Sequence, residues 1–163
     1  MVNTTTTGID NAQDNPGVIG PPPLIYAGPL VAGLLLSRTF PVKFLPRLVR
    51  LVVGGTCIAI ASVILPSAFR QMRNAKTNVN PTQPVTTIVT EGPFRFTRNP
   101  LYLSLTLLYA GIALVANALW AMLLLPIVLI VMNLGVIERE EQYLEHKFGE
   151  QYLRYKRQVR RWI

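Results

Sequence analysis

Residues 101–137 read LYLSLTLLYAGIALVANALWAMLLLPIVLIVMNLGVI, and these 37 positions contain no charged side chain. A single straight helix of that length would measure roughly 55 Å, almost twice the ~30 Å thickness of a hydrocarbon core. The segment must therefore fold back on itself. Asn117 is the expected turn, which predicts one helix over 101–116 and a second over 118–137, kinked at Pro126.

Two further apolar segments precede this hairpin. Residues 51–69 form nineteen uncharged positions between two arginines, which predicts a spanning helix. Residues 24–36 are shorter and contain Pro29, so they form either a spanning helix extended by flanking residues or a re-entrant or interfacial helix. Only 15% of residues are charged, below the ~25% of soluble domains. The sequence thus predicts an all-α integral membrane protein with about four transmembrane helices.

The ends of the chain suggest one membrane domain. Residues 1–20 are polar and contain no Lys or Arg, so we interpret them as a disordered tail that precedes a single domain over 21–163. One cysteine and one histidine, Cys57 and His146, exclude a disulfide framework or a Cys/His metal site, and no metal is expected. The basic residues of the C-terminal tail are interleaved with acids, which disfavours nucleic-acid binding.

The distribution of Lys and Arg orients the chain. The hairpin brings its two flanking charged segments to one face, and these carry twelve basic residues, whereas the loop 38–50 carries four. This count predicts that both flanking segments lie in the cytosol. The Lys and Arg residues around the first helix predict the opposite orientation, because loop 38–50 is more basic than the N-terminus.

The segment before the hairpin has the composition of an anion site. Asn99 and Pro100 are the residues favoured at the N-cap and first position of a helix. Arg95 and Arg98 lie beside this helix start, where unpaired N–H groups and the positive end of the helix dipole also attract anions. Lipid phosphates and membrane topology are the simpler explanations for both arginines.

The C-terminal tail has the pattern of an amphipathic cytosolic helix that can break at Gly149. Apolar side chains recur there at spacings of three and four, at Leu144, Phe148, Tyr152, Tyr155 and Val159. Glu140 and Glu141 fall on the same side as this stripe. Acids on the protein-facing side suggest a partner, either Arg98 or a cationic ligand. His146 is expected at the surface.

Two linked motifs resemble those of the isoprenylcysteine carboxyl methyltransferase family, which is related to phospholipid N-methyltransferases. GPFRFTRNPLY at 92–102 corresponds to a segment of the type R-H-P-x-Y. EREEQYLEHKFGEQYLRYKRQV at 138–159 corresponds to E-E-x-x-L-x-x-x-F-G-x-x-Y-x-x-Y. The resemblance covers residues 85–162, about half of the chain.

The resemblance implies a methyltransferase that uses S-adenosylmethionine, with a cofactor-binding half over 85–163. The substrate would be lipophilic and would enter from the bilayer, among membrane lipids. Arg98 would orient an anionic group, and Glu141 would accept a proton from an amine nucleophile. The residues implied in cofactor binding are Thr86, Thr87, Ile88, Val89, Phe94, Asn99, Pro100, Leu101, Tyr102 and Glu140.

Two positions depart from the family pattern. Asn99 replaces the usual His and cannot shuttle a proton. Val136 stands where eukaryotic members carry a substrate-binding Arg, so a substrate carboxylate would have to rely on Arg98 or on an inward-turned Arg139. We therefore expect an amine or thiol nucleophile. A phospholipid or small-molecule N- or S-methyltransferase and a non-catalytic membrane subunit remain alternatives, and the oligomeric state stays open.

Overall fold

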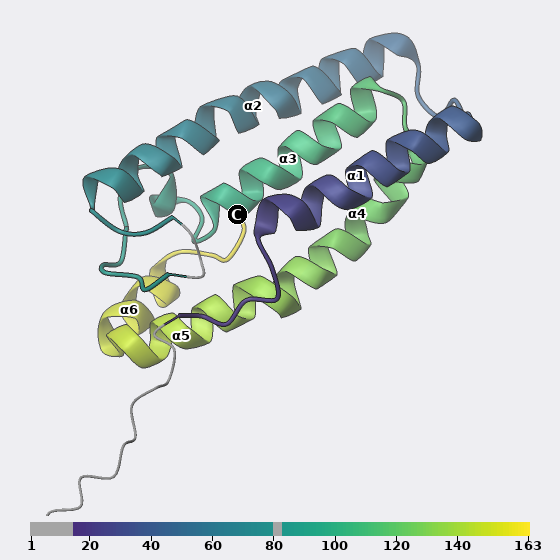
Figure 1. The fold of residues 1–163 in the computed structure, drawn as a ribbon. Helices are drawn as coiled ribbons and strands as arrows, with labels where there is room; N and C mark the ends of the chain where they lie inside the picture. Colours follow the sequence, from purple (N-terminus) through teal and green to yellow (C-terminus); the bar gives the residue numbers. More distant parts are fainter. Residues whose placement is uncertain (1–14, 80–82) are drawn as a thin grey trace, which may run out of the picture.

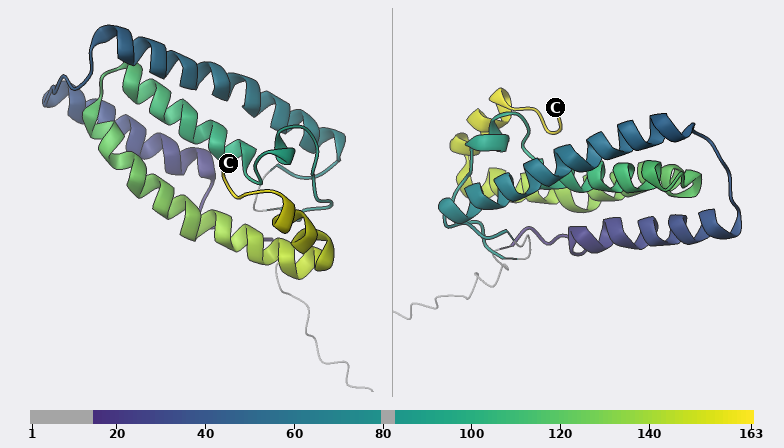
Figure 2. Two further views of the ribbon diagram at one scale, coloured as in Figure 1. Left: turned by 180° about the vertical axis from the view of Figure 1, so that it is seen from behind. Right: turned by 90° about the horizontal axis from the view of Figure 1, so that it is seen from above.

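The computed structural model describes residues 15–79 and 83–163, and within these ranges every regular element is a helix, as predicted. Four long helices lie side by side: α1 (Pro22–Thr39), α2 (Arg47–Asn74), α3 (Pro100–Val115) and α4 (Leu119–Met132) (Figure 1). The shorter elements are η1 (Gly92–Arg95), the π-helical η2 (Asn133–Ile137), α5 (Glu138–Phe148) and α6 (Glu150–Gln158). Seen from above, α3 and α4 lie between α2 on one side and α1 on the other (Figure 2).

The predicted hairpin is confirmed, with its turn at Asn117. This residue adopts a positive φ of 54°, a conformation that Asn tolerates better than most residues. Its Oδ1 accepts a hydrogen bond of 3.3 Å from the N–H of Leu45, and Trp120 Nε1 donates to the carbonyl of Phe40 at 3.0 Å. The α1–α2 loop and the α3–α4 turn therefore lie at the same end of the bundle.

The C-terminal charged segment does not start a separate helix. α4, η2 and α5 form one continuous helix of 30 residues over 119–148, which we call the long helix. At 1.5 Å per residue it is roughly 45 Å long, so its charged end, α5, extends beyond the apolar part. The break at Gly149 is confirmed, because α6 begins one residue later and Gly149 has a φ of 50°.

Within the described part of the chain, two helices are long and apolar enough to cross a membrane by length and composition: α2 and the long helix. α3 is also apolar but shorter, and four spans remain a prediction. Large hydrophobic side chains stay exposed on both candidate spans, among them Val52 and Val63 on α2 and Ile127 and Ile130 on α4. Exposed apolar side chains on both helices are what lipid contact requires, and they support a membrane protein.

Small residues let the helices approach closely. A Cβ added at Gly54 of α2 would lie 2.8 Å from the carbonyl oxygen of Gly111 of α3. A Cβ added at Gly33 of α1 would overlap the backbone of Ala121 of α4. Glycine and alanine at helix contacts are typical of membrane bundles, in which close backbone packing replaces the hydrophobic effect.

The N-terminal segment differs from the expectation of a disordered tail that reaches residue 20. Residues 1–14 lie outside the described residues, but residues 15–20 run along the long helix. The N–H of Ile19 donates to the carbonyl of Gly135 at 3.2 Å, and Arg139 NH1 donates to the carbonyl of Gly17 at 2.7 Å. The absence of a Cβ at Gly135 leaves the room that the side chain of Ile19 occupies.

Candidate active site

A pocket opens at the end of the bundle opposite the Asn117 turn, where α2 ends, α3 begins and the long helix passes into α5. Eleven of the twelve residues that the sequence singled out line it: Thr87, Ile88, Val89, Phe94, Arg98, Asn99, Pro100, Leu101, Tyr102, Glu140 and Glu141. Thr86 is the exception, because its Oγ1 donates to the carbonyl of Lys76 at 2.9 Å and it does not line the pocket. The two charged segments thus share one face, as predicted.

Tyr102 and Glu140 join two walls of the pocket. Tyr102 lies in the first turn of α3 and is buried, and its hydroxyl donates to Glu140 Oε1 at 2.6 Å. This distance is typical of a charge-assisted O–H···O⁻ hydrogen bond. The bond uses one lone pair of the carboxylate, so Glu140 keeps acceptor capacity for a ligand.

Arg98 presents unsatisfied donors beside the pocket. Its side chain is only 9% exposed, and its NH2 lies 3.2 Å from Glu141 Oε1. Its Nε and NH1 are buried and have no hydrogen-bond partner among the described residues. Buried guanidinium donors are normally paired, and a carboxylate or phosphate is the geometry that suits them. Two nitrogens of Arg98, a residue that lines the pocket, are therefore available to donate to a ligand.

Asn99 precedes the helix as predicted, but its side chain has another role. α3 begins at Pro100, and no side-chain hydrogen bond from Asn99 caps it. The Nδ2 of Asn99 instead donates to the carbonyl of Arg161 at 3.0 Å, the same carbonyl that accepts from Thr97 Oγ1. Asn99 thus holds the predicted N-cap position, but its side chain makes a long-range contact instead of a capping bond, because the C-terminus lies beside the start of α3 (Figure 1).

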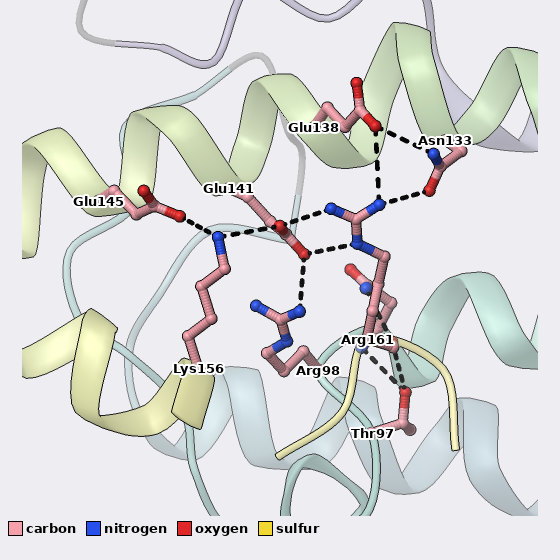
Figure 3. Close-up of polar contacts among 9 residues, drawn as sticks. Thr97, Arg98, Asn133, Glu138, Glu141, Glu145, Lys156 and Arg161 are labelled. Carbon is pink, nitrogen blue, oxygen red and sulfur yellow. Dashed lines mark hydrogen bonds and ion pairs between the residues drawn. The ribbon is translucent and has the colours of Figure 1, made fainter. Parts of the chain in front are cut away.

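Glu141 lies at the centre of a cluster of charges (Figure 3). It is 5% exposed, and Arg161 holds both of its oxygens, with Nε at 3.0 Å and NH2 at 2.9 Å. Arg98 and Lys156 approach the same carboxylate at 3.2 and 3.6 Å. Hydrogen bonding to Glu141 also raises the pKa of Arg161. Both oxygens of the Glu141 carboxylate are thus engaged by cationic side chains, so this arrangement disfavours Glu141 as a proton acceptor.

Tyr152 and Tyr155 of α6 form another wall. Their rings meet edge to face at 6.2 Å, and the hydroxyl of Tyr155 donates to the carbonyl of Phe94 at 2.7 Å. Burial raises the pKa of Tyr152 to about 12 and also raises that of Tyr155, so both remain neutral phenols at physiological pH. The stripe predicted for the tail thus faces the protein, and His146 is exposed as expected.

The sequence reasoning missed several parts of the site. Arg161 and Lys156 were not singled out, because Arg161 follows the last helix and no periodicity marks it. The end of α2 and the residues after it, together with the N-terminal segment, also line the pocket through Met72, Thr77, Asn78, Val79 and Pro16. A charged residue two positions after Val159, the last residue of the apolar stripe, was the only signal for Arg161.

Neither Val136 nor Arg139 places a positive charge in the pocket, where a substrate carboxylate would need one. Val136 lies in η2 and is fully buried in the core. Arg139 is exposed and donates to Gly17, so it does not turn inward. Arg98 is the only Lys or Arg among the described residues that line the pocket.

Comparisons with known proteins place the chain in a family. Residues 49–151 match the family model described as phospholipid methyltransferase. A 63-residue segment is 46% identical to an uncharacterized protein of Haemophilus influenzae; the match covers 39% of this chain and all of that protein. No solved structure matches the chain.

Proposed function

Because the chain belongs to the phospholipid methyltransferase family, we propose that it transfers a methyl group from S-adenosylmethionine to a lipophilic substrate that enters from the bilayer. The observation that supports this most directly is the pairing of opposite charges in one pocket. Arg98 offers two buried, unpaired donors, and Glu140 offers a carboxylate that Tyr102 orients. The zwitterionic amino-acid group of S-adenosylmethionine needs a cationic donor for its carboxylate and an anionic acceptor for its ammonium group.

The remaining lining suits the other parts of this cofactor. Phe94, Leu101 and Val89 give an apolar surface for a purine ring, and Glu140 can accept hydrogen bonds from an ammonium group or ribose hydroxyls. The carboxylate of the methionine part would pair with Nε and NH1 of Arg98. These residues thus match the group in charge and polarity.

Positioning and exclusion of water are the contributions we assign to the protein. When bound, S-adenosylmethionine supplies a methyl group already activated by its sulfonium. Tyr102 and Glu140 orient the ligand, and the buried rings of Tyr152 and Tyr155 keep water from that side of the pocket. Because Glu141 is saturated by cations, we assign it to holding Arg98 in place rather than to accepting a proton.

The substrate we favour is an amphiphile with an amine or thiol nucleophile, as in phospholipid or small-molecule N- or S-methyltransferases. Arg98 is the only pocket cation among the described residues, and in our proposal it holds the cofactor. A substrate carboxylate taken out of water would then lack a partner, which is costly. A prenylcysteine carboxylate is the alternative that the family resemblance alone would favour.

We further propose that four helices cross the membrane and that the pocket faces the cytosol. The structure places the four basic residues of 38–50 at the end opposite the pocket, whereas the twelve others belong to segments on the pocket side. This asymmetry follows the positive-inside rule. The α1–α2 and α3–α4 connections would then face the other compartment.

Ligand binding tests the proposal before any substrate is known. Calorimetry on purified protein in detergent should show binding of S-adenosylmethionine and of its product S-adenosylhomocysteine. Arg98→Gln should weaken both by at least about tenfold, since it removes a charge-assisted interaction. Arg95→Gln is the matched control, because Arg95 is exposed and lies outside the pocket. Folded wild-type protein that binds neither ligand would refute the proposal.

A further inference from the structure

The last five residues of the chain form a strap across the start of α3. After α6 the backbone becomes extended at Val159, with φ −123° and ψ 132°, and the chain turns back. The N–H of Arg98 donates to the carbonyl of Arg160 at 3.0 Å. Thr97 Oγ1 and Asn99 Nδ2 both donate to the next carbonyl, that of Arg161. Three consecutive residues, 97–99, are thus hydrogen-bonded to the strap formed by residues 159–163.

The side chain of Arg161 connects this strap to the long helix (Figure 3). Two of its nitrogens hold both oxygens of Glu141, and its NH1 donates to Asn133 Oδ1 at 2.9 Å. The same NH1 lies 3.7 Å from Glu138 Oε1. Arg161 therefore bridges η2 and α5 to the segment that carries Arg98.

Arg161 and Arg98 compete for the same carboxylate. A bidentate pair is the preferred geometry between an arginine and a carboxylate. Arg161 occupies that geometry, so Arg98 is left with one contact to Glu141, through NH2. The other two donor nitrogens of Arg98, Nε and NH1, remain unpaired. If Arg161 were removed, Arg98 could take both oxygens of Glu141 and lose donors that a ligand needs.

We propose that Arg161 is a positioning residue: by holding Glu141 in a bidentate pair, it reserves the guanidinium of Arg98 for the carboxylate of the cofactor. This inference rests on the proposed function, and it assigns to the strap a role that neither motif of the sequence includes. Arg161 does not line the pocket and is not expected to touch the ligand.

Two ligands separate a positioning role from a general structural one. S-adenosylhomocysteine carries the amino-acid group, whereas 5′-methylthioadenosine lacks it and presents only the purine, ribose and thioether. Calorimetry on the full chain in detergent should show that Arg161→Gln weakens the binding of S-adenosylhomocysteine by about tenfold. The affinity for 5′-methylthioadenosine should be unchanged. Arg160→Gln is the matched control, because its exposed side chain has no contact of this kind and its backbone carbonyl is retained.

The possible calorimetry results separate the inference about Arg161 from the proposed function. Unchanged S-adenosylhomocysteine affinity in Arg161→Gln overturns the inference while the proposed function stands. An equal loss for both ligands also overturns it, because it indicates general disruption. Wild-type protein that binds neither ligand refutes the proposed function itself. If Arg161→Gln does not fold, Asn133→Ala is the second variant, because it removes one hydrogen-bond acceptor of Arg161 outside the pocket. It should lower the affinity for S-adenosylhomocysteine by less than Arg161→Gln and leave that for 5′-methylthioadenosine unchanged. An unchanged affinity for S-adenosylhomocysteine in this variant overturns the inference.

Discussion

The hydroxyl of Tyr102 donates to Glu140 Oε1 at 2.6 Å, although the two residues are 38 positions apart in the sequence. The contact exists because the α3–α4 hairpin leaves one end of the bundle and returns to it. It joins the first turn of α3 to α5, and thus connects the two sequence motifs in one pocket.

Glu140→Gln should weaken S-adenosylmethionine binding by tenfold to a hundredfold. The change keeps the shape of the side chain but removes its charge, which loses a charge-assisted hydrogen bond worth roughly 1.5–3 kcal/mol. Calorimetry measures the effect. Glu150→Gln is the control, because that carboxylate is exposed at the start of α6. Equal affinities for Glu140→Gln and wild type would show that Glu140 does not contact the cofactor.

Cysteine labelling should place the pocket segments on one side of the membrane. In a Cys57→Ala background, single cysteines at Glu91 and Gln158 should react with an impermeant probe from the same side. A cysteine at Lys43 should react from the opposite side, because the α1–α2 loop lies at the other end of the bundle. All three residues are exposed. Opposite labelling of Glu91 and Gln158 would contradict the shared pocket.

Gly54→Ala should lower the melting temperature of the purified protein, whereas Gly55→Ala should not. An added Cβ at Gly54 would lie 2.8 Å from Gly111 O and from Val115 Cγ2, while one at Gly55 would meet nothing within 4 Å. Overpacking of this kind costs about 1–3 kcal/mol. Both substitutions replace Gly by Ala and raise the helix propensity of α2 by the same amount, so they form a matched pair. Equal melting temperatures would mean that α2 and α3 are not packed this closely.

Methylation of a prenylcysteine carboxylate should be weak beside methylation of a neutral or basic amphiphile. Val136 is buried and Arg139 faces Gly17, so neither provides a cation for a substrate carboxylate. A transfer assay with radiolabelled donor can compare a farnesylcysteine analogue, phosphatidylethanolamine and a small thiol. Saturable methylation of the farnesylcysteine analogue alone would reverse this prediction.

The sequence determined the helical class, the turn at Asn117 and the placement of the two charged segments at one end. These features depend on local quantities: the length of an uncharged run, the position of a turn residue and the spacing of charges. A hairpin of about twice the membrane thickness has to return to the face it left, whichever way its side chains pack. This is why the segments before and after the hairpin could be placed at one face before their contacts were known. The individual lining residues over 87–102 and 140–141 were implied mainly by the resemblance to a family.

Only the tertiary structure decided how the charges pair and which segments cover the pocket. Asn99 holds the predicted N-cap position of α3, but its side chain donates to the carbonyl of Arg161 because the chain reverses after Val159. Residues 15–20 were expected to be disordered, but Gly135 leaves room for Ile19 to pack against the long helix. Such contacts depend on distant residues meeting in space, and no local periodicity or charge pattern encodes them.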